Sequence, residues 1–474
     1  MNGLAIATRN KPGRGLGRFI DWSEASAPAY AFVRPAARVD DLVVALRWLG
    51  ILRGDWYTPL SIGGSTGQTF IGAMSTGTHG ADFGEQPLCD AVLGLQVLTG
   101  PREVWVQAKP RAPIKTPGGA AFGRWAGCAG KPLVPVPEQA ALRAGTVALG
   151  HAGVIAGALV ELRRAGSRTQ PEVMNERGVK RKWSSVLQDL AANGRRSTLF
   201  TAPPSPRPGE DGGAKPRYLE LMPNPFTTPP TVWVVSRVAK PGDASQAGLK
   251  PHRKPLNAIG AFAQASVGHL GEAFETIVAG TRASGLTTSG VALSWAPSIE
   301  VMRLGIPGFL PSRSYEFCFP IDAKLPNGRS AYLWFADRCV QAARRHLARM
   351  VTTVRFTRPS KAPLAMQCFP NRVGLVAEVE VNFLRRFSSI GLDPSAQAAL
   401  DFILLHPALG HADVRAHWGQ EDTPSRLAHV SRYPRKKQWA TGLRKIHGLT
   451  PTGNLPASWR SAYSEEIGVP GAFT

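Results

Sequence analysis

The sequence predicts an α+β protein with two lobes. Its 474 residues are enough for two or three domains, and 43% of them are hydrophobic, so the chain has the material for a substantial core. The 50 glycines and 40 prolines favour a loop-rich architecture that contains strands over a helical bundle. The second half of the chain alternates strand and helix patterns in α+β style. No apolar run reaches the ~18 residues of a membrane-spanning helix, so we expect no such helix.

The chain is strongly basic. Lysine and arginine number 56 against 33 aspartates and glutamates, which gives a formal net charge of +23. Such an excess is compatible with a nucleic-acid partner, an anionic membrane surface or no specific partner. The basic runs RRAGSR, RGVKRK, RRH and RKK carry no interleaved aromatic residues, and no helix-turn-helix, zinc or RNA-recognition signature is present. We therefore expect solvated faces that make at most weak contact with anionic surfaces, and no specific nucleic acid.

The spacing of the cysteines indicates whether a metal or disulfide site is expected, and the first residues of the chain indicate the expected cellular location. The five cysteines lie far apart and form no CxxC or Cys/His pattern, so neither a disulfide framework nor a metal site is expected. The opening residues, MNGLAIATRNKPGRGLGRF, include basic side chains but no apolar region and no cleavage site of a secretory signal. The expected location is the cytoplasm.

The first third of the chain predicts strands around one clear helix. Residues 30–50 indicate a short strand, a turn at Pro35 and an amphipathic helix with apolar residues at helical spacing. Residues 91–106 (AVLGLQVLTGPREVWV) predict a hairpin with a Gly-Pro turn. Residues 146–162 predict a helix end followed by a buried strand.

The amino-acid composition of the chain changes after Arg163. Residues 166–217 are polar and basic, and 201–216 (TAPPSPRPGEDGGAKP) predict a linker or long loop. Beyond it, strands are expected at 231–239, 313–321, 351–357 and 375–384, and helices at 261–285 and 330–350.

The segment from Gly63 to Gly80 carries the most chemical information. It is rich in glycine, serine and threonine and poor in charge. Glycines permit close approach of the backbone, hydroxyls bind phosphate or ribose, and successive N–H groups form an anion site. The spacing matches neither a Walker A loop nor G-x-G-x-x-G. From spacing alone, a ligand-binding loop and a plain tight turn remain equal alternatives.

This segment resembles the FAD-binding domain of the vanillyl-alcohol oxidase superfamily, the PCMH type. The residues that carry the likeness are IGGSTGQTFIGAMSTGTHGADFGEQPLCDAVLGLQVLTG. The nearest branch holds aldonolactone oxidases such as D-arabinono-1,4-lactone oxidase, alditol oxidases and flavin-linked cholesterol oxidases. Further segments are similar in the same order: Trp22-Ser23 with VRPAARVDDLVVAL, LGHAGVIAGALVEL at 149–162, VRFTRPSKAPLAM at 354–366, AHWGQ at 416–420 and RYP at 432–434.

The resemblance implies a two-lobed PCMH-type fold: an FAD-binding domain over residues 20–165, a substrate-capping α+β domain over 166–412 with a linker near 201–216, and a C-terminal segment, 413–474, that returns to the FAD domain. It also implies which residues line the flavin and its diphosphate: Gly63, Ser65, Thr69, Gly72, Ser75, Thr78, His79 and Gly80, with the backbone of Ile155 at the adenine.

The chemistry implied is oxidation of a CH–OH group on a polyol, an aldonolactone or a sterol-like alcohol. A hydride passes to the flavin, and O₂ is the expected acceptor for reoxidation. Arg355 is expected where negative charge develops, and His417 and Gln420 are expected to face the ring. Glu316 and His417 are candidates for the proton-transfer base.

Three features depart from the pattern of the resembled enzymes. Only GILRGDWYT lies between Leu49 and Pro59, where they carry a glycine-rich diphosphate loop and, in covalent members, the flavin-linking histidine. FAD, if bound, is therefore expected to be non-covalent. Thr353 stands where the alditol- and sterol-type enzymes place a glutamate, and Gln420 where alditol oxidases have lysine.

Other interpretations of the same residues remain open. The chain is alternatively a degenerate relative that has lost FAD binding and activity, or a basic polyanion-binding protein. Arg355 is equally expected to pair with a carboxylate such as Glu378 or Glu380, and Glu316 to be a strand residue with a polar partner. His417 is also compatible with a buried histidine of the core, and His79 with a loop residue rather than a catalyst.

Overall fold

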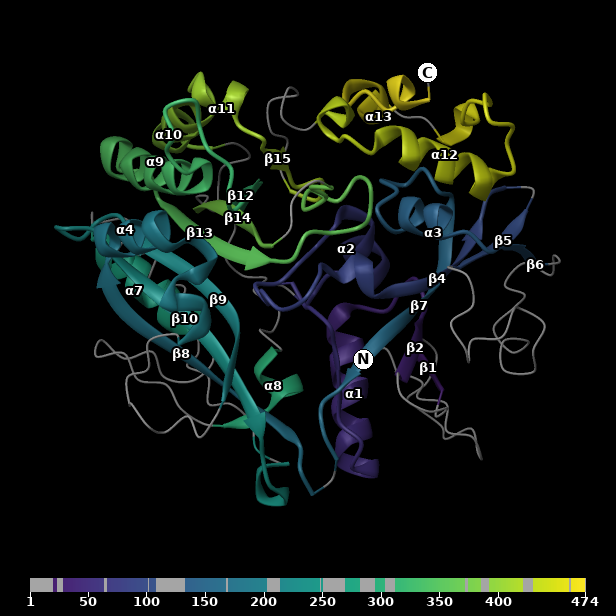
Figure 1. Ribbon diagram of the computed structural model, residues 1–474, viewed down its shortest axis with the longest axis horizontal. Coiled ribbons are helices and arrows are strands. Elements are labelled where there is room, and N and C mark those ends of the chain that lie inside the picture. Colours follow the sequence, from purple (N-terminus) through teal and green to yellow (C-terminus); the bar gives the residue numbers. More distant parts are fainter. Residues whose placement is uncertain are drawn as a thin grey trace.

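The computed structural model forms two antiparallel-rich sheets that lie side by side, with helices both on their outer sides and between them (Figure 1). The structure describes residues 20–23, 29–63, 66–100, 102–107, 133–167, 169–202, 214–247, 249, 269–281, 295–302, 312–370, 374–384, 392–420, 429–459 and 462–473. The predicted linker at 201–216 lies mostly outside these ranges, as does the start of the helix predicted at 261–285.

The first sheet, which we call the small sheet, is built from the N-terminal part of the chain. Its order is β1-β2-β7-β4-β5-β6, with β3 also paired to β7, seven strands within the described residues. The strands are β1 Ile20–Ser23, β2 Ala29–Val33, β3 Tyr57–Pro59, β4 Val92–Leu98, β5 Glu103–Gln107, β6 Leu133–Val136 and β7 Val154–Arg164. The helices that accompany it are α1 Val39–Arg53, α2 Phe70–Thr76 and α3 Gln139–Thr146.

The second sheet, which we call the large sheet, follows from the middle of the chain. Its order is β11-β8-β10-β9-β13-β14-β12-β15, eight antiparallel strands in the part of the chain that the structure describes. They are β8 Glu172–Lys182, β9 Lys215–Asn224, β10 Thr231–Pro241, β11 Ala296–Pro297, β12 Ser312–Pro320, β13 Met350–Thr357, β14 Val376–Leu384 and β15 Arg415–Ala416.

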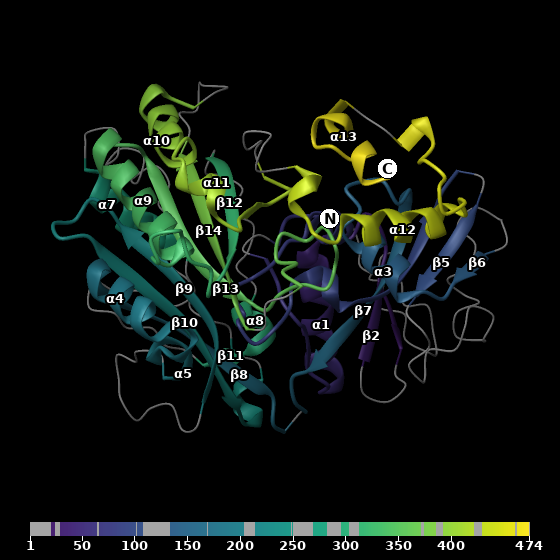
Figure 2. The same cartoon turned by 45° about the horizontal axis from the view of Figure 1, so that its top comes forward.

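Most of the helices from the middle of the chain pack on one face of the large sheet, while the helix at 270–281 packs on the opposite face through Phe274, and the chain end returns to the small sheet (Figures 1 and 2). The middle helices are α4 Trp183–Asn193, α5 Thr198–Thr201, α7 Leu270–Thr281, α8 Ser298–Met302, α9 Ala331–His346, α10 Pro394–Leu404 and α11 Ala408–His411. The last are α12 Lys436–His447 and α13 Ala462–Glu466, and α12 packs along α3 (Figure 2).

Period-2 alternation decides what each face of the large sheet carries. Phe317, Val354 and Val379 on three neighbouring strands point into an apolar core shared with α4, α9 and α10. The residues next to them in sequence must point to the opposite face. That opposite face, which we call the charged face, carries Glu316, Arg355, Glu378 and Glu380, all of them buried or nearly so.

Most predicted elements are present close to their expected bounds. The strand-turn-helix at 30–50, the hairpin at 91–106 and the strands at 231–239, 313–321, 351–357 and 375–384 are confirmed. The polar and basic composition of residues 166–217 predicted no strand or helix. This segment nevertheless contains β8, α4 and the start of β9. The expectation of solvated basic runs is wrong for Arg177 of RGVKRK, which is 2% exposed and lies over the Trp295 ring.

Candidate functional site

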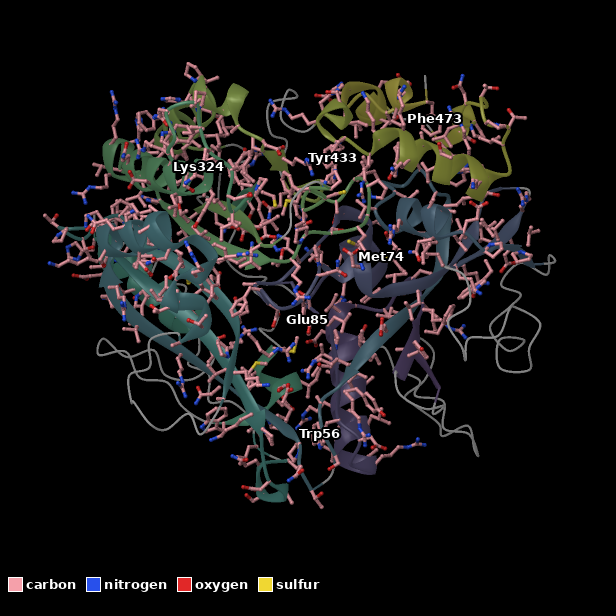
Figure 3. The ribbon with its side chains drawn as sticks, viewed as in Figure 1. Trp56, Met74, Glu85, Lys324, Tyr433 and Phe473 are labelled. Atoms are coloured by element: carbon pink, nitrogen blue, oxygen red, sulfur yellow. The ribbon has the colours of Figure 1, made fainter. Side chains whose placement is uncertain are left out.

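The site lies where the charged face of the large sheet meets the loop that follows α2 of the small sheet. Figure 3 labels Glu85 and Tyr433, which lie along this boundary. Glu85 Oε1 lies 3.3 Å from Arg217 at one end. At the other end the Tyr433 hydroxyl donates to the Ala416 carbonyl at 3.2 Å, and its ring stacks on Trp418. The site is therefore an internal one between two packed bodies.

Arg355 is the centre of a buried ion-pair network. It projects from β13, and its Nη2 donates to Glu316 Oε1 of β12 at 2.6 Å and to Glu380 Oε2 of β14. The register places Glu316 opposite Glu380, so one guanidinium serves two facing carboxylates. The pairing of Arg355 with Glu380 confirms one of the two structural partners expected for it.

A carboxylate reaches the space next to Thr353 from the neighbouring strand. Thr353 occupies the position two residues before Arg355, and it lies opposite Glu380 in the register of β13 and β14. Its hydroxyl donates to Glu380 Oε2 at 3.5 Å. A carboxylate therefore reaches Arg355 from the neighbouring strand.

His79 joins the network from the other body. Its Nε2 lies 3.1 Å from Glu316 Oε1, while its Nδ1 donates to the Gly80 carbonyl at 2.8 Å. Both ring nitrogens thus face acceptors, which is the arrangement of an imidazolium. Burial opposes the charge, but the carboxylates of Glu316 and Glu378 outweigh it and raise the pKa of His79.

The C-terminal segment brings His417 and Gln420 to the same place. Pairing of β15 with β12 sets the His417 N–H 3.0 Å from the Glu316 carbonyl. Gln420 Nε2 lies 3.2 Å from both Glu316 Oε2 and Glu380 Oε1, so it bridges the two carboxylates. His417 Nδ1 accepts from the Gly419 N–H at 2.9 Å, and burial lowers the pKa of His417 to about 4.

The charges in the network are fixed by their partners. Burial alone raises the pKa of a carboxyl, but Arg355 and then His79 hold the pKa of Glu316 well below its usual range. Burial opposes the charge of Arg355, yet Glu316 and Glu380 raise its pKa further. Burial raises the pKa of Glu380 even though Arg355 pulls the other way, and the Glu316 charge adds to the rise. The ion pair of Arg355 with Glu316 is thus the permanently charged part.

Glu378 is held differently from the other two carboxylates. It is fully buried, and its Oε1 accepts from the Thr357 hydroxyl. The His79 Nδ1 is 3.7 Å from the same oxygen, and Oε2 has no hydrogen-bond partner within the described residues. Burial raises the pKa of Glu378 to about 7, although His79 and Thr357 act against the rise.

The residues predicted to line a cofactor fall into two groups. Those of the first group lie in α2 or next to it, and their side chains form hydrogen bonds to nearby residues. Thr69 caps α2, where its side chain accepts from the Gly72 N–H at 3.2 Å. Ser75 lies inside α2, and Thr78 donates to Gln68 Oε1 at 3.3 Å.

The second group lies at the boundary or along the small sheet. Gly80 packs so closely that an added Cβ would lie 2.5 Å from the Ile62 carbonyl oxygen. Gly63, which follows Ile62 in the sequence, is also buried. Ile155 lies on β7 opposite Val97 of β4. Ser65 lies outside the described residues.

Sequence reasoning gave three members of the site no role of their own. Glu380 and Glu378 were expected only as partners of Arg355, although the alternation in VAEVEVNF places both on one face with it. Gln367 was not predicted at all. It is fully buried, both its amide atoms lack hydrogen-bond partners among the described residues, and its Oε1 would lie 3.9 Å from a Cβ added at Gly77.

The described residues contain neither a metal-binding cluster nor a membrane-spanning helix. No group of three or more histidine, cysteine, aspartate or glutamate side chains in these ranges could hold a metal ion. No helix among them is long and apolar enough to cross a membrane.

Comparison with known proteins gives the fold. No protein-family model matches the chain, and no curated protein matches it. A solvent-stable cholesterol oxidase superposes with a TM-score of 0.57 at 12% identity, covering 95% of this chain and 84% of that one. A histidine variant of the cholesterol oxidase from Brevibacterium sterolicum gives 0.57 at 12%, covering 94% and 83%. The chain thus has the α+β two-domain fold of these oxidases.

Proposed function

We propose that this protein is an FAD-dependent oxidoreductase that oxidises a CH–OH group of a small-molecule alcohol. The observation that carries the proposal is the buried network of His79, Glu316 and Arg355 at the domain boundary of an oxidase fold. A buried, fixed positive charge is suited to stabilise negative charge that develops on a substrate oxygen. The finer choice among polyol, aldonolactone and sterol-like alcohols, and the use of O₂, belong to the proposal.

The residues at the boundary fit a polar heterocycle. Some of the buried polar atoms that have no hydrogen-bond partner within the described ranges lie there: Arg355 Nε, Glu378 Oε2, Gln420 Oε1 and both amide atoms of Gln367. A buried polar atom costs free energy unless it finds a partner, and the edge of a flavin offers both donors and acceptors. We propose that these side chains and the Gly77–Gly80 turn hold the ring, with non-covalent attachment. When bound, the flavin supplies the hydride acceptor.

The roles of the remaining chain parts follow from this proposal. Residues 20–165 form the FAD-binding domain and 166–412 the capping domain. The segment 413–474 pairs with the capping domain through β15 and returns to the first domain through α12, which packs on α3. Arg355 orients the substrate oxygen, and Gln420 holds the two carboxylates apart. His417 keeps a neutral ring and fixes the backbone at Glu316.

Purification tests the proposal directly. The protein purified from cells grown with riboflavin, or mixed with FAD and desalted, is expected to retain yellow flavin absorbance in a 1:1 ratio. FAD is also expected to raise the melting temperature as its concentration exceeds the Kd. Absence of both effects would reject the oxidoreductase.

A second function is favoured by one structural feature. α1 ends at Arg53 and β3 begins at Tyr57, so no diphosphate loop intervenes. A relative that has lost FAD would have this short connection. It predicts a colourless protein whose melting temperature does not respond to FAD, and the same experiment separates the two. The excess of basic residues would then remain for weak contact with anionic surfaces, which steep loss of binding with salt would reveal.

A further inference from the structure

The proposed oxidation needs a group that accepts the proton of the substrate hydroxyl, and several carboxylates lie on the charged face. Glu220 on β9, opposite Arg355, already accepts from the Tyr218 hydroxyl at 2.6 Å, which leaves Glu316, Glu380 and Glu378 to be compared. Glu316 is paired with Arg355 and His79, so its negative charge is already stabilised by two cations. Glu380 shares the same guanidinium and accepts from Gln420. Both are bound into the network, and a proton placed on either would break an ion pair.

Glu378 differs in what it holds. Its Oε1 accepts from Thr357, and its closest cation, His79, gives its Nδ1 proton to the Gly80 carbonyl instead. Its Oε2 is unpartnered within the described residues, and the side chain is fully buried on the same face as Arg355. An oxygen with open lone pairs beside a fixed positive charge is the arrangement of a proton acceptor.

His417 does not offer this capacity. Its Nδ1 already accepts from the Gly419 N–H, and burial lowers its pKa to about 4. Glu378 has instead a pKa raised by burial to about 7, which lies near an ordinary working pH. The groups that face Glu378 are His79 after α2, Glu316 and Cys318 on β12, Arg355 and Thr357 on β13, and Glu380 on its own strand.

We propose that Glu378 Oε2 is the base that takes the substrate hydroxyl proton, an inference that rests on the proposed function. As the substrate C–H bond breaks, its electron pair would leave with the hydrogen as a hydride, for which a bound flavin would supply the acceptor. The O–H bond breaks at the same time, its proton passes to Glu378 Oε2, and its electron pair forms the second bond of the carbonyl. Arg355 keeps its charge throughout and holds the oxygen, and Glu378 later returns the proton to water.

The first test does not depend on turnover. Protein labelled with ¹³C in the glutamate carboxyl is titrated by NMR, and wild type is expected to show one buried carboxyl that titrates near pH 7. Glu378→Gln must remove that signal, while Glu272→Gln, a change at an exposed glutamate on α7, must keep it. A wild-type spectrum with no carboxyl titrating near neutral pH overturns the proposal.

The second test follows flavin bleaching under anaerobic conditions in FAD-loaded protein. The probes are cholesterol, xylitol and an aldonolactone. Glu378→Gln is expected to slow reduction by about 10²-fold or more and to remove the rise of rate with pH. Glu378→Asp keeps a carboxyl and should recover part of the rate, and Glu272→Gln should equal wild type. If the Glu378→Gln protein keeps FAD and its flavin is reduced as fast as in wild type, this proposal alone is overturned. If the wild-type protein binds no FAD, or if none of the three probes reduces its flavin, the proposed function is overturned as well.

Discussion

His79 Nε2 and Glu316 Oε1 lie 3.1 Å apart and join the loop after α2 to strand β12 of the large sheet. The two residues are 237 positions apart in the chain, and both side chains are buried. An ion pair of this kind stabilises the packing of the two bodies only while both partners are charged. The ion pair should therefore contribute to stability only in the pH range where both His79 and Glu316 are charged, and its strength should depend on Arg355, which binds the same carboxylate oxygen.

Removal of the His79 imidazole should cost stability in a defined pH range. The raised pKa of His79 means that its contribution is fully present below its ordinary value of 6.5 and is lost as pH rises through the folded value. The lowered pKa of Glu316 means that its contribution is present above 4.5 and is lost as pH falls. His79→Ala should therefore cost about 3 kcal/mol near pH 6 and less at pH 9. Urea unfolding at both values measures it, with the exposed His269→Ala as control, and an equal cost at both would contradict the ion pair.

Arg355 and Glu316 should be strongly coupled. Arg355→Met leaves Glu380 without its cation and Glu316 with His79 alone, and the unfolding free energy should fall by about 3–5 kcal/mol. Glu316→Gln removes one of the two carboxylate charges that Arg355 balances, so the double variant should be more stable than Arg355→Met alone. A double-mutant cycle by denaturant unfolding should give a coupling of about 1 kcal/mol or more. Strict additivity would show that the two side chains do not act as a pair.

Glu378 should make the protein less stable as pH rises. Its pKa is about 7 when folded against an ordinary 4.5, so the folded state binds the proton more tightly and loses stability between these values. Glu378→Gln cannot ionise, and its stability relative to wild type should improve by about 3 kcal/mol between pH 4 and pH 9. Thermal unfolding across this range measures the change. A constant difference would mean that Glu378 is ionised throughout.

Gly80 should resist substitution for reasons of space. A Cβ there would lie 2.5 Å from the Ile62 carbonyl oxygen, which is backbone and cannot rotate away. Gly80→Ala should cost about 1–3 kcal/mol. Gly84 is the matched control, since a Cβ there meets no atom within 4 Å in the described structure. Equal melting temperatures for the two alanine variants would argue against the close approach.

Asp90, which lies just before β4 of the small sheet, should hold the connection between β13 and β14 in place. It accepts from the Ser360 hydroxyl at 2.5 Å and from the Lys361 N–H at 2.9 Å. Asp90→Ala leaves both donors without this partner, and a loss of about 1–3 kcal/mol is expected. Hydrogen exchange should rise in residues 359–369 and not elsewhere. The exposed Asp401→Ala on α10 serves as control, and unchanged exchange in the connection would contradict the anchor.

The sequence by itself determined the local structure where its patterns were strong. Alternation in RSYEFCFPI and VAEVEVNFL set strands with one apolar and one polar face, because successive side chains point to opposite sides. The helical spacing in the segment that became α9 was equally clear. It did not predict β8, because its polar, basic residues carry no apolar period and tertiary pairing with β10 decides the strand. It also missed α4, although the buried Trp183, Val186 and Leu190 recur there at helical spacing.

Only the tertiary structure decided which of the candidate residues meet. Arg355, Glu316, His79, His417 and Gln420 were each predicted separately, and strand register together with packing of the two bodies brought them within hydrogen-bond reach of one another. It also decided that Glu380 supplies a carboxylate opposite Thr353 and that Glu378 keeps an open oxygen. A one-dimensional pattern contains no register between strands, and burial, which sets the pKa of each carboxyl, arises only when the chain is packed.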